Sequence, residues 1–223
     1  MNSTNMKVEE LPIIYGPMME VLDVKLAKGL IFQIINKTNQ LVQSIYAGAL
    51  HEDLFIAVMR DLLNFSKTFR FCLMVAVEAK QRINQQKYPP KVNQGIIVDY
   101  KLVSSVTGID KNTASDALSN LTKLHSMESM TTKWMDSFLV QSKGFVKERK
   151  WCEYDKPRML CLAMMEEVGE LCGVLKFANE KDGEVSCRVY SDMVSEICDI
   201  FIYFCRLSDV CGFFEIIKKE VAD

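Results

Sequence analysis

The sequence predicts an all-α protein, a bundle of helices. Only five prolines and ten glycines interrupt its 223 residues, and runs that alternate between apolar and polar residues are scarce. Apolar residues recur instead at steps of three and four, the period of a helix with one buried face. Hydrophobic residues make up 49% of the chain, which is enough for a sizeable core.

The first half is expected to begin with a frayed polar tail over residues 1–12. Gly29 separates the first two expected helices, and turn-forming residues over 64–66 interrupt the third. Pro89 and Pro90 end that third segment, because proline cannot continue a helix. The expected helical segments are about 17–28, 30–47 and 52–86.

The second half follows a connector over residues 91–100. Thr131 or Thr132 is suited to cap a helix, Pro157 suits a first helical turn, and Gly212 interrupts the last long segment. Apolar lines at helical spacing run from Leu160 to Leu175 and from Met193 to Leu207. The expected helices are 100–107, 111–125, 132–150, 157–177, 189–210 and 213 to the end.

Composition narrows the class of protein. The net charge of −2 argues against a partner that is a nucleic-acid polymer. Eight cysteines form no CxxC pair and only two histidines exist, so a zinc site is not expected. Free buried thiols predict a reducing, intracellular setting, and we expect a cytoplasmic protein. No apolar run reaches the roughly 20 residues that span a bilayer, so no membrane partner is expected.

Two pairs of carboxylates lie in otherwise apolar helices. Glu167 and Glu170 are three residues apart, as are Glu196 and Asp199. Residues at this spacing share a helix face, and like charges so close repel unless a cation lies between them. Four carboxylates offer the oxygen ligands that Mg²⁺ or Mn²⁺ prefers, whereas a di-iron bundle site would need histidines. The alternative for either pair alone is a solvated helix face.

Several segments carry a resemblance in order. They are Lys147–Trp151 (KERKW), Lys156–Leu160 (KPRML), Glu167–Leu171 (EVGEL) and Glu196–Tyr203 (EICDIFIY). This pattern resembles the MazG-like all-α NTP pyrophosphohydrolases, and the dCTP pyrophosphatase branch most of all. The resemblance covers about residues 131–220. It implies a Mg²⁺-dependent hydrolysis of a (deoxy)nucleoside triphosphate, dCTP or a modified analogue, to the monophosphate and pyrophosphate.

The resemblance also implies roles for particular residues. Glu167, Glu170, Glu196 and Asp199 would be the catalytic metal ligands. The residues implied near the nucleotide are Trp151, Lys156, Arg158, Lys176, Phe177 and Tyr203. Arg206 is added only because it shares a helical stripe with Asp199. Ser142 stands where the eukaryotic branch tends to carry a base-contacting histidine, which weakens the expectation of cytosine. Glu166 is an additional acid, either a solvated neighbour or a group that orients water.

The first half resembles the same unit without its acids. Lys37 stands at the position of Glu167 and Gln40 at that of Glu170, while Asn84-Gln85-Gln86-Lys87-Tyr88-Pro89 resembles the tail of the family fold. One register then places Leu54 and Ala57 at the second acid pair, and a slipped one places Asp61 at Asp199. Asn84, Lys87 or Tyr88 would complete the nucleotide site of the second repeat. The alternative is that helical bundles simply look alike.

The resulting division has four parts: a tail (1–12), a degenerate repeat (13–95), a helical connector (96–130) and a catalytic repeat (131–223). The two repeats would form a covalent pseudo-dimer, and two chains could pair as a homodimer. Two other functions compete with a dCTP-type enzyme. One is an NTPase of relaxed specificity that removes damaged nucleotides, and the other is a non-catalytic helical scaffold or nucleotide-binding regulator.

Overall fold

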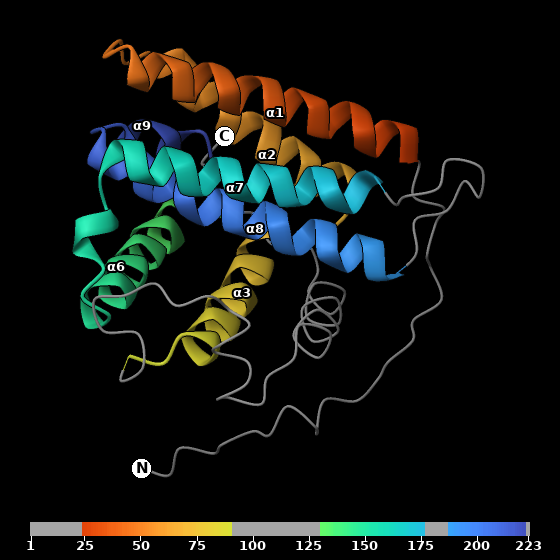
Figure 1. Cartoon of the computed structure of the whole chain (residues 1–223). Coiled ribbons are helices and arrows are strands. Elements are labelled where there is room, and N and C mark those ends of the chain that lie inside the picture. The colour runs from red at the N-terminus through yellow and green to blue at the C-terminus, as the bar shows by residue number, and fades with distance from the viewer. Residues whose placement is uncertain (1–23, 91–129, 177–186, 222–223) are drawn as a thin grey trace.

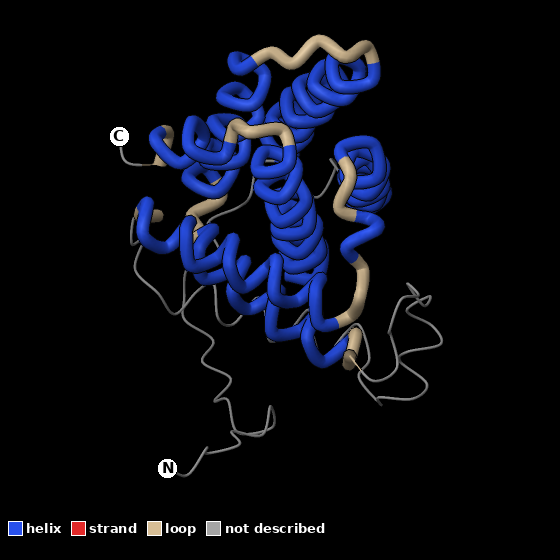
Figure 2. Tube along the Cα trace, turned by 90° about the vertical axis from the view of Figure 1, so that its left-hand side faces the viewer, coloured by secondary structure: helices blue, strands red, loops and turns tan. Residues whose placement is uncertain are grey.

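The computed structural model describes residues 24–90, 130–176 and 187–221. Within these ranges the regular elements are all helical and no strand occurs, which confirms the all-α prediction (Figure 2). The expected tail, the expected helices over 100–107 and 111–125, and Phe177 lie outside the described residues. The elements are α1 (Val24–Tyr46), α2 (Glu52–Thr68), α3 (Leu73–Lys87), α6 (Thr132–Glu148), the 3-10 helix η2 (Cys152–Tyr154), α7 (Pro157–Lys176), α8 (Cys187–Val210) and α9 (Phe214–Lys219).

Helix α8 lies at the centre of this bundle. It packs along α7 and also contacts α2, α3, α6 and α9, while α1 lies against α2 and α7 (Figure 1). The apolar lines expected from the sequence are buried in α7 and α8, as predicted. They consist of Leu160, Met164, Val168, Leu171 and Leu175 on α7, and of Met193, Ile197, Ile200, Phe204 and Leu207 on α8.

Local sequence explains where several helices begin and end. The Thr131 hydroxyl accepts a hydrogen bond from the Trp134 backbone N–H at 3.2 Å and so caps α6. Helix α7 begins at Pro157, whose fixed φ suits a first turn. Gly48 and Gly212 adopt left-handed φ values of 73° and 81° after α1 and α8, a conformation that glycine adopts without strain.

The two helix breaks expected in the first half are wrong. Helix α1 continues through Gly29, because Ala27 and Ile31 on either side are fully buried in the same core. One glycine costs only about 1 kcal/mol relative to alanine, which this packing outweighs. Helix α2 also continues through 64–66, where the Ser66 hydroxyl donates to the Leu63 carbonyl at 2.8 Å and stays satisfied inside the helix.

The actual break between α2 and α3 falls later, at Phe69–Cys72. Arg70 takes a left-handed φ of 53° there without being glycine. The Phe69 and Phe71 rings both pack near Phe65, at centroid distances of 4.4 and 6.3 Å. The Tyr190 hydroxyl on α8 donates to the Phe69 carbonyl at 3.1 Å. Tertiary packing therefore fixes a turn that no turn-forming residue in the sequence predicts.

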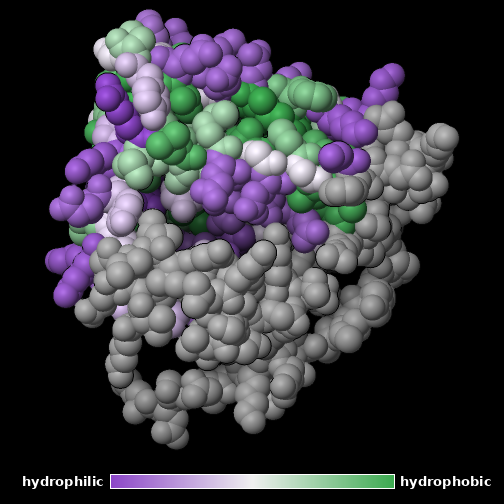
Figure 3. All heavy atoms as spheres, in the orientation of Figure 1, coloured by the Kyte–Doolittle hydropathy of each residue, from purple (hydrophilic) through white to green (hydrophobic). Residues whose placement is uncertain are grey.

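The described surface carries both polar and apolar side chains. Figure 3 shows apolar residues among polar ones across the part of this face where α1 and α7 run. Phe32 on α1 and Leu162 on α7 are among the exposed large apolar side chains. No helix in the described part of the chain combines the length and the apolar character needed to cross a membrane.

Candidate functional site

Three of the four predicted acids come together between α7 and α8. Carboxylate oxygens of Glu167, Glu170 and Glu196 all lie within 4.8 Å of one another. Glu196 is buried, Glu167 is partly buried and Glu170 is exposed, so the cluster runs from the core to the surface. Such an oxygen-rich group, open on one side, suits a hard divalent cation and leaves room for a further ligand.

The fourth predicted acid, Asp199, binds a lysine from the first half of the chain. Its Oδ2 lies 2.6 Å from the Lys80 ammonium on α3. Its Oδ1 accepts a hydrogen bond from the Asn84 amide at 3.4 Å. The Lys80 ammonium also donates to the Ser195 hydroxyl at 2.5 Å. Asn84 was expected near the second repeat, whereas Lys80 was not identified from the sequence.

The surroundings of Glu167 favour its protonated form. Burial, followed by the charges of Asp199 and Glu196, raises the pKa of Glu167 to about 9, although Lys80 opposes this shift. Burial alone would lower the pKa of Lys80, but the charges of Asp199 and Glu196 raise it above its usual value. Glu167 therefore holds a proton at neutral pH in the absence of a cation. A divalent cation among the three glutamates would replace that proton, so the donor set fits Mg²⁺ or Mn²⁺.

A cavity of about 320 Å³ adjoins Asp199. It lies between α3, α6, α7 and α8, so both halves of the chain contribute to its wall. Its lining mixes aromatic rings with neutral amides and hydroxyls. The lining residues that bear on the site are Gln81, Asn84, Gln85, Tyr88, Gln141, Ser142, Phe145, Trp151, Tyr154, Glu166, Asp199, Tyr203 and Arg206.

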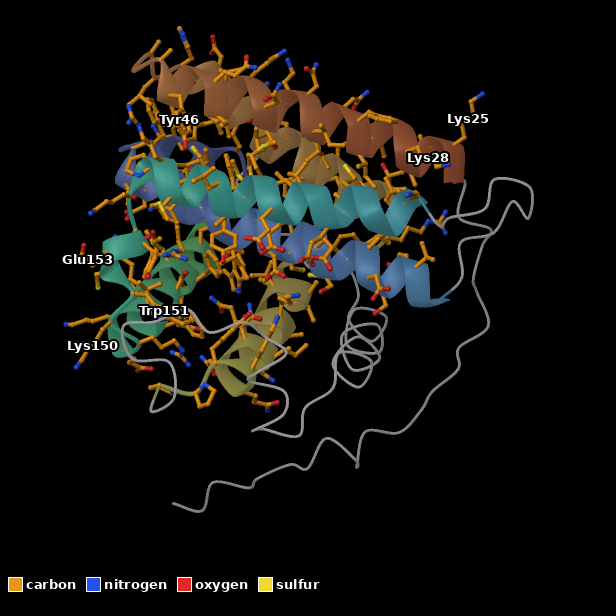
Figure 4. All side chains as sticks on the ribbon, viewed as in Figure 1. Lys25, Lys28, Tyr46, Lys150, Trp151 and Glu153 are labelled. Carbon is orange, nitrogen blue, oxygen red and sulfur yellow. The ribbon has the colours of Figure 1, made fainter. Side chains whose placement is uncertain are left out.

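Aromatic side chains form one wall of this cavity. The Trp151 ring meets Tyr88 edge-on at a centroid distance of 5.7 Å and Phe145 edge-on at 5.8 Å. Trp151 is buried beside η2, at the opposite end of the molecule from Lys25 and Lys28 (Figure 4). Aromatic rings of this kind can pack against a flat heterocycle either by offset stacking or edge to face.

The buried side chain of Arg149 connects two parts of this wall. The Arg149 guanidinium donates through Nε to the Tyr88 carbonyl at 2.5 Å and through Nη1 to the Phe145 carbonyl at 2.9 Å. It also lies over the Phe145 ring, 3.6 Å from its centroid. Arg149 thus joins the end of α3 to the end of α6. Arg149 belongs to the KERKW motif, but nothing in the sequence indicates this role.

Two tyrosines bring hydroxyl donors to the cavity. Burial, then the charges of Asp199 and Glu167, raises the pKa of Tyr88. Burial, then the charges of Glu167 and Asp199, likewise raises the pKa of Tyr203. Both phenols therefore stay protonated at neutral pH. Tyr203 was predicted at the site, and it lines the cavity.

The structure places Lys156, Arg158 and Lys176 outside the lining of the cavity. Lys156 pairs with Glu153 at 3.5 Å on the surface. Arg158 lies over the Tyr46 ring of α1, 5.4 Å from its centroid. Lys176 is exposed at the end of α7 and does not line the cavity. Arg206, by contrast, lines the cavity and forms an ion pair with Asp155.

Comparison of the chain with protein-family models, with curated proteins and with solved structures finds no match in any of the three.

Proposed function

We propose that the protein is a Mg²⁺-dependent pyrophosphohydrolase, with Mn²⁺ as an alternative ion, that cleaves a (deoxy)nucleoside triphosphate to the monophosphate and pyrophosphate. One observation carries the proposal. A cluster of three glutamates suited to a divalent cation lies beside an aromatic-walled cavity large enough for a nucleobase, and Asp199 joins the two. The resemblance to dCTP pyrophosphatases supports the same reaction and favours dCTP or a modified analogue as substrate.

In this proposal the two ends of the site have different tasks. Glu167, Glu170 and Glu196 would hold the cation, which when bound neutralises phosphate charge. The aromatic wall around Trp151 orients the nucleoside and excludes water from its faces. The Tyr203 hydroxyl and the Asn84 amide, both lining the cavity, are placed to donate to the substrate between these ends.

Asp199 is the group best placed to act on a water molecule. It lines the cavity next to the acid cluster, and its Oδ2 lies 2.6 Å from the Lys80 ammonium. A carboxylate at such a position can orient a water molecule or accept its proton. Glu166 also lines the cavity and is the other acid available for this task.

We further propose that the chain is a tandem repeat. Helices α1, α2 and α3 would correspond to α7, α8 and α9. In support, α1 packs with α2 as α7 packs with α8, and α3 packs on α8 as α9 packs on α2. The first repeat carries Lys37 and Gln40 where the second carries its glutamates, so only the second would bind catalytic metal.

The ends of α2 and α8 support this correspondence. After α2, the Phe71 N–H donates to the Ser66 carbonyl at 3.1 Å. After α8, the Phe213 N–H donates to the Ser208 carbonyl at 2.7 Å. Each turn contains one left-handed residue, Arg70 or Gly212. Matching Ser66 to Ser208 aligns Leu54 and Ala57 with the second acid pair, although the same turn geometry also ends α1 and α6.

The deciding experiment incubates the protein with Mg²⁺ and a panel of ribo- and deoxynucleoside triphosphates. Pyrophosphate is measured separately from orthophosphate. We expect pyrophosphate release, and in Glu170→Gln and Glu196→Gln a loss larger than the roughly 10–100-fold that removal of an outer-shell partner costs, since each would be a direct ligand. Lys37→Ala, the matched change in the first repeat, should retain the activity of the unmodified protein. Absence of pyrophosphate from every substrate would refute the proposal.

A non-catalytic, nucleotide-binding regulator is the second candidate function. The Lys80–Asp199 pair favours it, because an ammonium already neutralises one of the four acids. A regulator would bind nucleotide without turnover and with little dependence on Mg²⁺. An enzyme of relaxed specificity would instead release pyrophosphate from most members of the panel.

A further inference from the structure

A salt-bridged guanidinium lies at the end of the cavity away from the acid cluster. Arg206 lines the cavity two helical turns after Asp199 on α8, which is about 10 Å along the helix axis. If the acid cluster receives the phosphates, a nucleoside directed along α8 brings the far edge of its base to Arg206. Tyr203, one turn before Arg206, lies between these ends, and the guanidinium is 5.6 Å from its ring centroid.

The ion pair with Asp155 determines what Arg206 can still bind. Its Nε and Nη2 donate to Asp155 Oδ1 at 3.2 and 2.7 Å. Both side chains are largely buried, with exposed fractions of 11% and 22%. The opposite charges of Arg206 and Asp155 cancel, so the guanidinium does not require a phosphate group as its counter-ion. A guanidinium has five N–H donors, and among the described residues Nη1 has no acceptor.

The other polar groups that line the cavity discriminate less between nucleobases. The amides of Gln81, Gln85 and Gln141 and the hydroxyl of Ser142 can each donate or accept, so they suit any base edge. Arg206 can only donate. Two carboxylates also line the cavity, those of Glu166 and Asp199, and they accept hydrogen bonds without donating them. They lie on α7 and α8 beside members of the acid cluster.

We propose that Arg206 selects the base by donating to a carbonyl oxygen on the edge farthest from the sugar. Guanine offers O6 there and uracil or thymine offers O4, whereas adenine and cytosine present at the same position an amino group that would face the guanidinium donors. The site therefore prefers 6-keto purines and 4-keto pyrimidines. This inference rests on the proposed function, in which the phosphates lie at the acid cluster, and it departs from the cytosine preference that the resemblance favours.

The test is equilibrium binding of deoxynucleoside monophosphates in the presence of Mg²⁺, measured by isothermal titration calorimetry. We expect dGMP and dUMP to bind at least about tenfold more tightly than dAMP and dCMP, the scale of one well-formed base contact. Arg206→Gln should bring that ratio close to one. Arg206→Lys, which keeps the charge beside Asp155 but loses the planar fork, should reduce the ratio in part.

Two controls separate selectivity from folding. Arg60→Gln removes an exposed ion pair with Glu220 far from the cavity and should leave the ratio unchanged. Asp155→Asn keeps the guanidinium and should keep the keto preference, which provides a second test if Arg206→Gln does not fold. Circular dichroism verifies the fold of each variant.

Three results would overturn the inference: equal affinity for all four monophosphates, an unchanged ratio in Arg206→Gln, or no binding of any of them. Pyrophosphate release without keto preference would refute the inference and leave the proposed function standing. Keto-selective binding without pyrophosphate release from any triphosphate would support the inference and refute the enzymatic proposal.

Discussion

The ammonium of Lys80 on α3 lies 2.6 Å from the Asp199 carboxylate on α8, so the two halves of the chain meet in a nearly buried ion pair. The exposed fractions of the two side chains are only 10% and 14%. Removing one partner of such a pair leaves the other charge poorly solvated, which is far more costly than the loss of a surface pair.

Replacing Lys80 by methionine should lower the free energy of unfolding by about 3 kcal/mol in EDTA, because Asp199 then stays buried without its cation. Urea denaturation measures this change. The matched control is Lys143→Met, which breaks an equally short but more exposed pair with Asp209 and should cost under about 1 kcal/mol. Equal losses in the two variants would contradict the view that burial makes the first pair important.

Stability in EDTA should fall as the pH rises through the range set by Glu167. Its pKa is raised from 4.5 to about 9, so between these values the folded protein holds a proton that the unfolded chain has released. More protons bound in the folded state means that unfolding becomes easier with rising pH. The melting temperature across pH 5 to 9 tests this expectation, and Glu167→Gln should flatten the decline.

Added Mg²⁺ should reverse that trend, because a cation replaces the proton and favours the charged cluster. Melting temperatures at pH 8 should rise with Mg²⁺ concentration in the unmodified protein. The rise should disappear in Glu196→Gln and persist in Lys37→Ala. A rise of equal size in all three proteins would mean that the ion binds elsewhere.

Arg149→Met should destabilise the protein by about 3 kcal/mol, since it removes two charge-assisted hydrogen bonds from a fully buried side chain. It should also weaken nucleotide binding, because Tyr88 and Phe145 lose the group that holds their carbonyls. Thermal unfolding and calorimetry measure the two effects. Stability and affinity that both match the unmodified protein would show that Arg149 is not the connection between α3 and α6.

Two glycines should respond in opposite ways to alanine. A Cβ atom at Gly29 or at Gly212 would meet nothing within 4 Å, so only the backbone decides. Gly29→Ala in the second turn of α1 should stabilise by about 0.5–1 kcal/mol. Gly212→Ala should destabilise by about 1–2 kcal/mol, because its φ of 81° is left-handed. Changes of the same sign in denaturant unfolding would contradict the described backbone.

Helical periodicity was sufficient to predict α7 and α8. Every residue of the two predicted lines is buried, because helical spacing is a local property of the sequence, although α7 also buries Cys161 and α8 also buries Tyr190, Val194, Cys198, Phe201 and Cys205. The acid pairs were found for the same reason, since spacing along one helix places two carboxylates on one face. Glu167, Glu170 and Glu196 do come together, although Asp199 turned out to face a lysine.

Contacts between distant helices were harder to predict. Lys80 lies within an alternating mixture of apolar and charged residues, and only the packing of α3 on α8 reveals its partner. Arg158 and Lys156 follow the motif that suggested them, but α7 directs Arg158 towards Tyr46 and Lys156 remains beside Glu153. The α2–α3 turn lies later in the sequence than predicted, because it depends on aromatic packing and not on turn-forming residues.

The supply of Lys80 and Asn84 by α3 has a genetic consequence. Lys80 and Asn84 contact Asp199 from another helix, and 115 residues of chain separate Asn84 from Asp199. A gene split between the two halves would give two polypeptides, neither of which carries the full set of site residues. We expect such fragments to complement each other only when they are co-expressed and reassemble around α8.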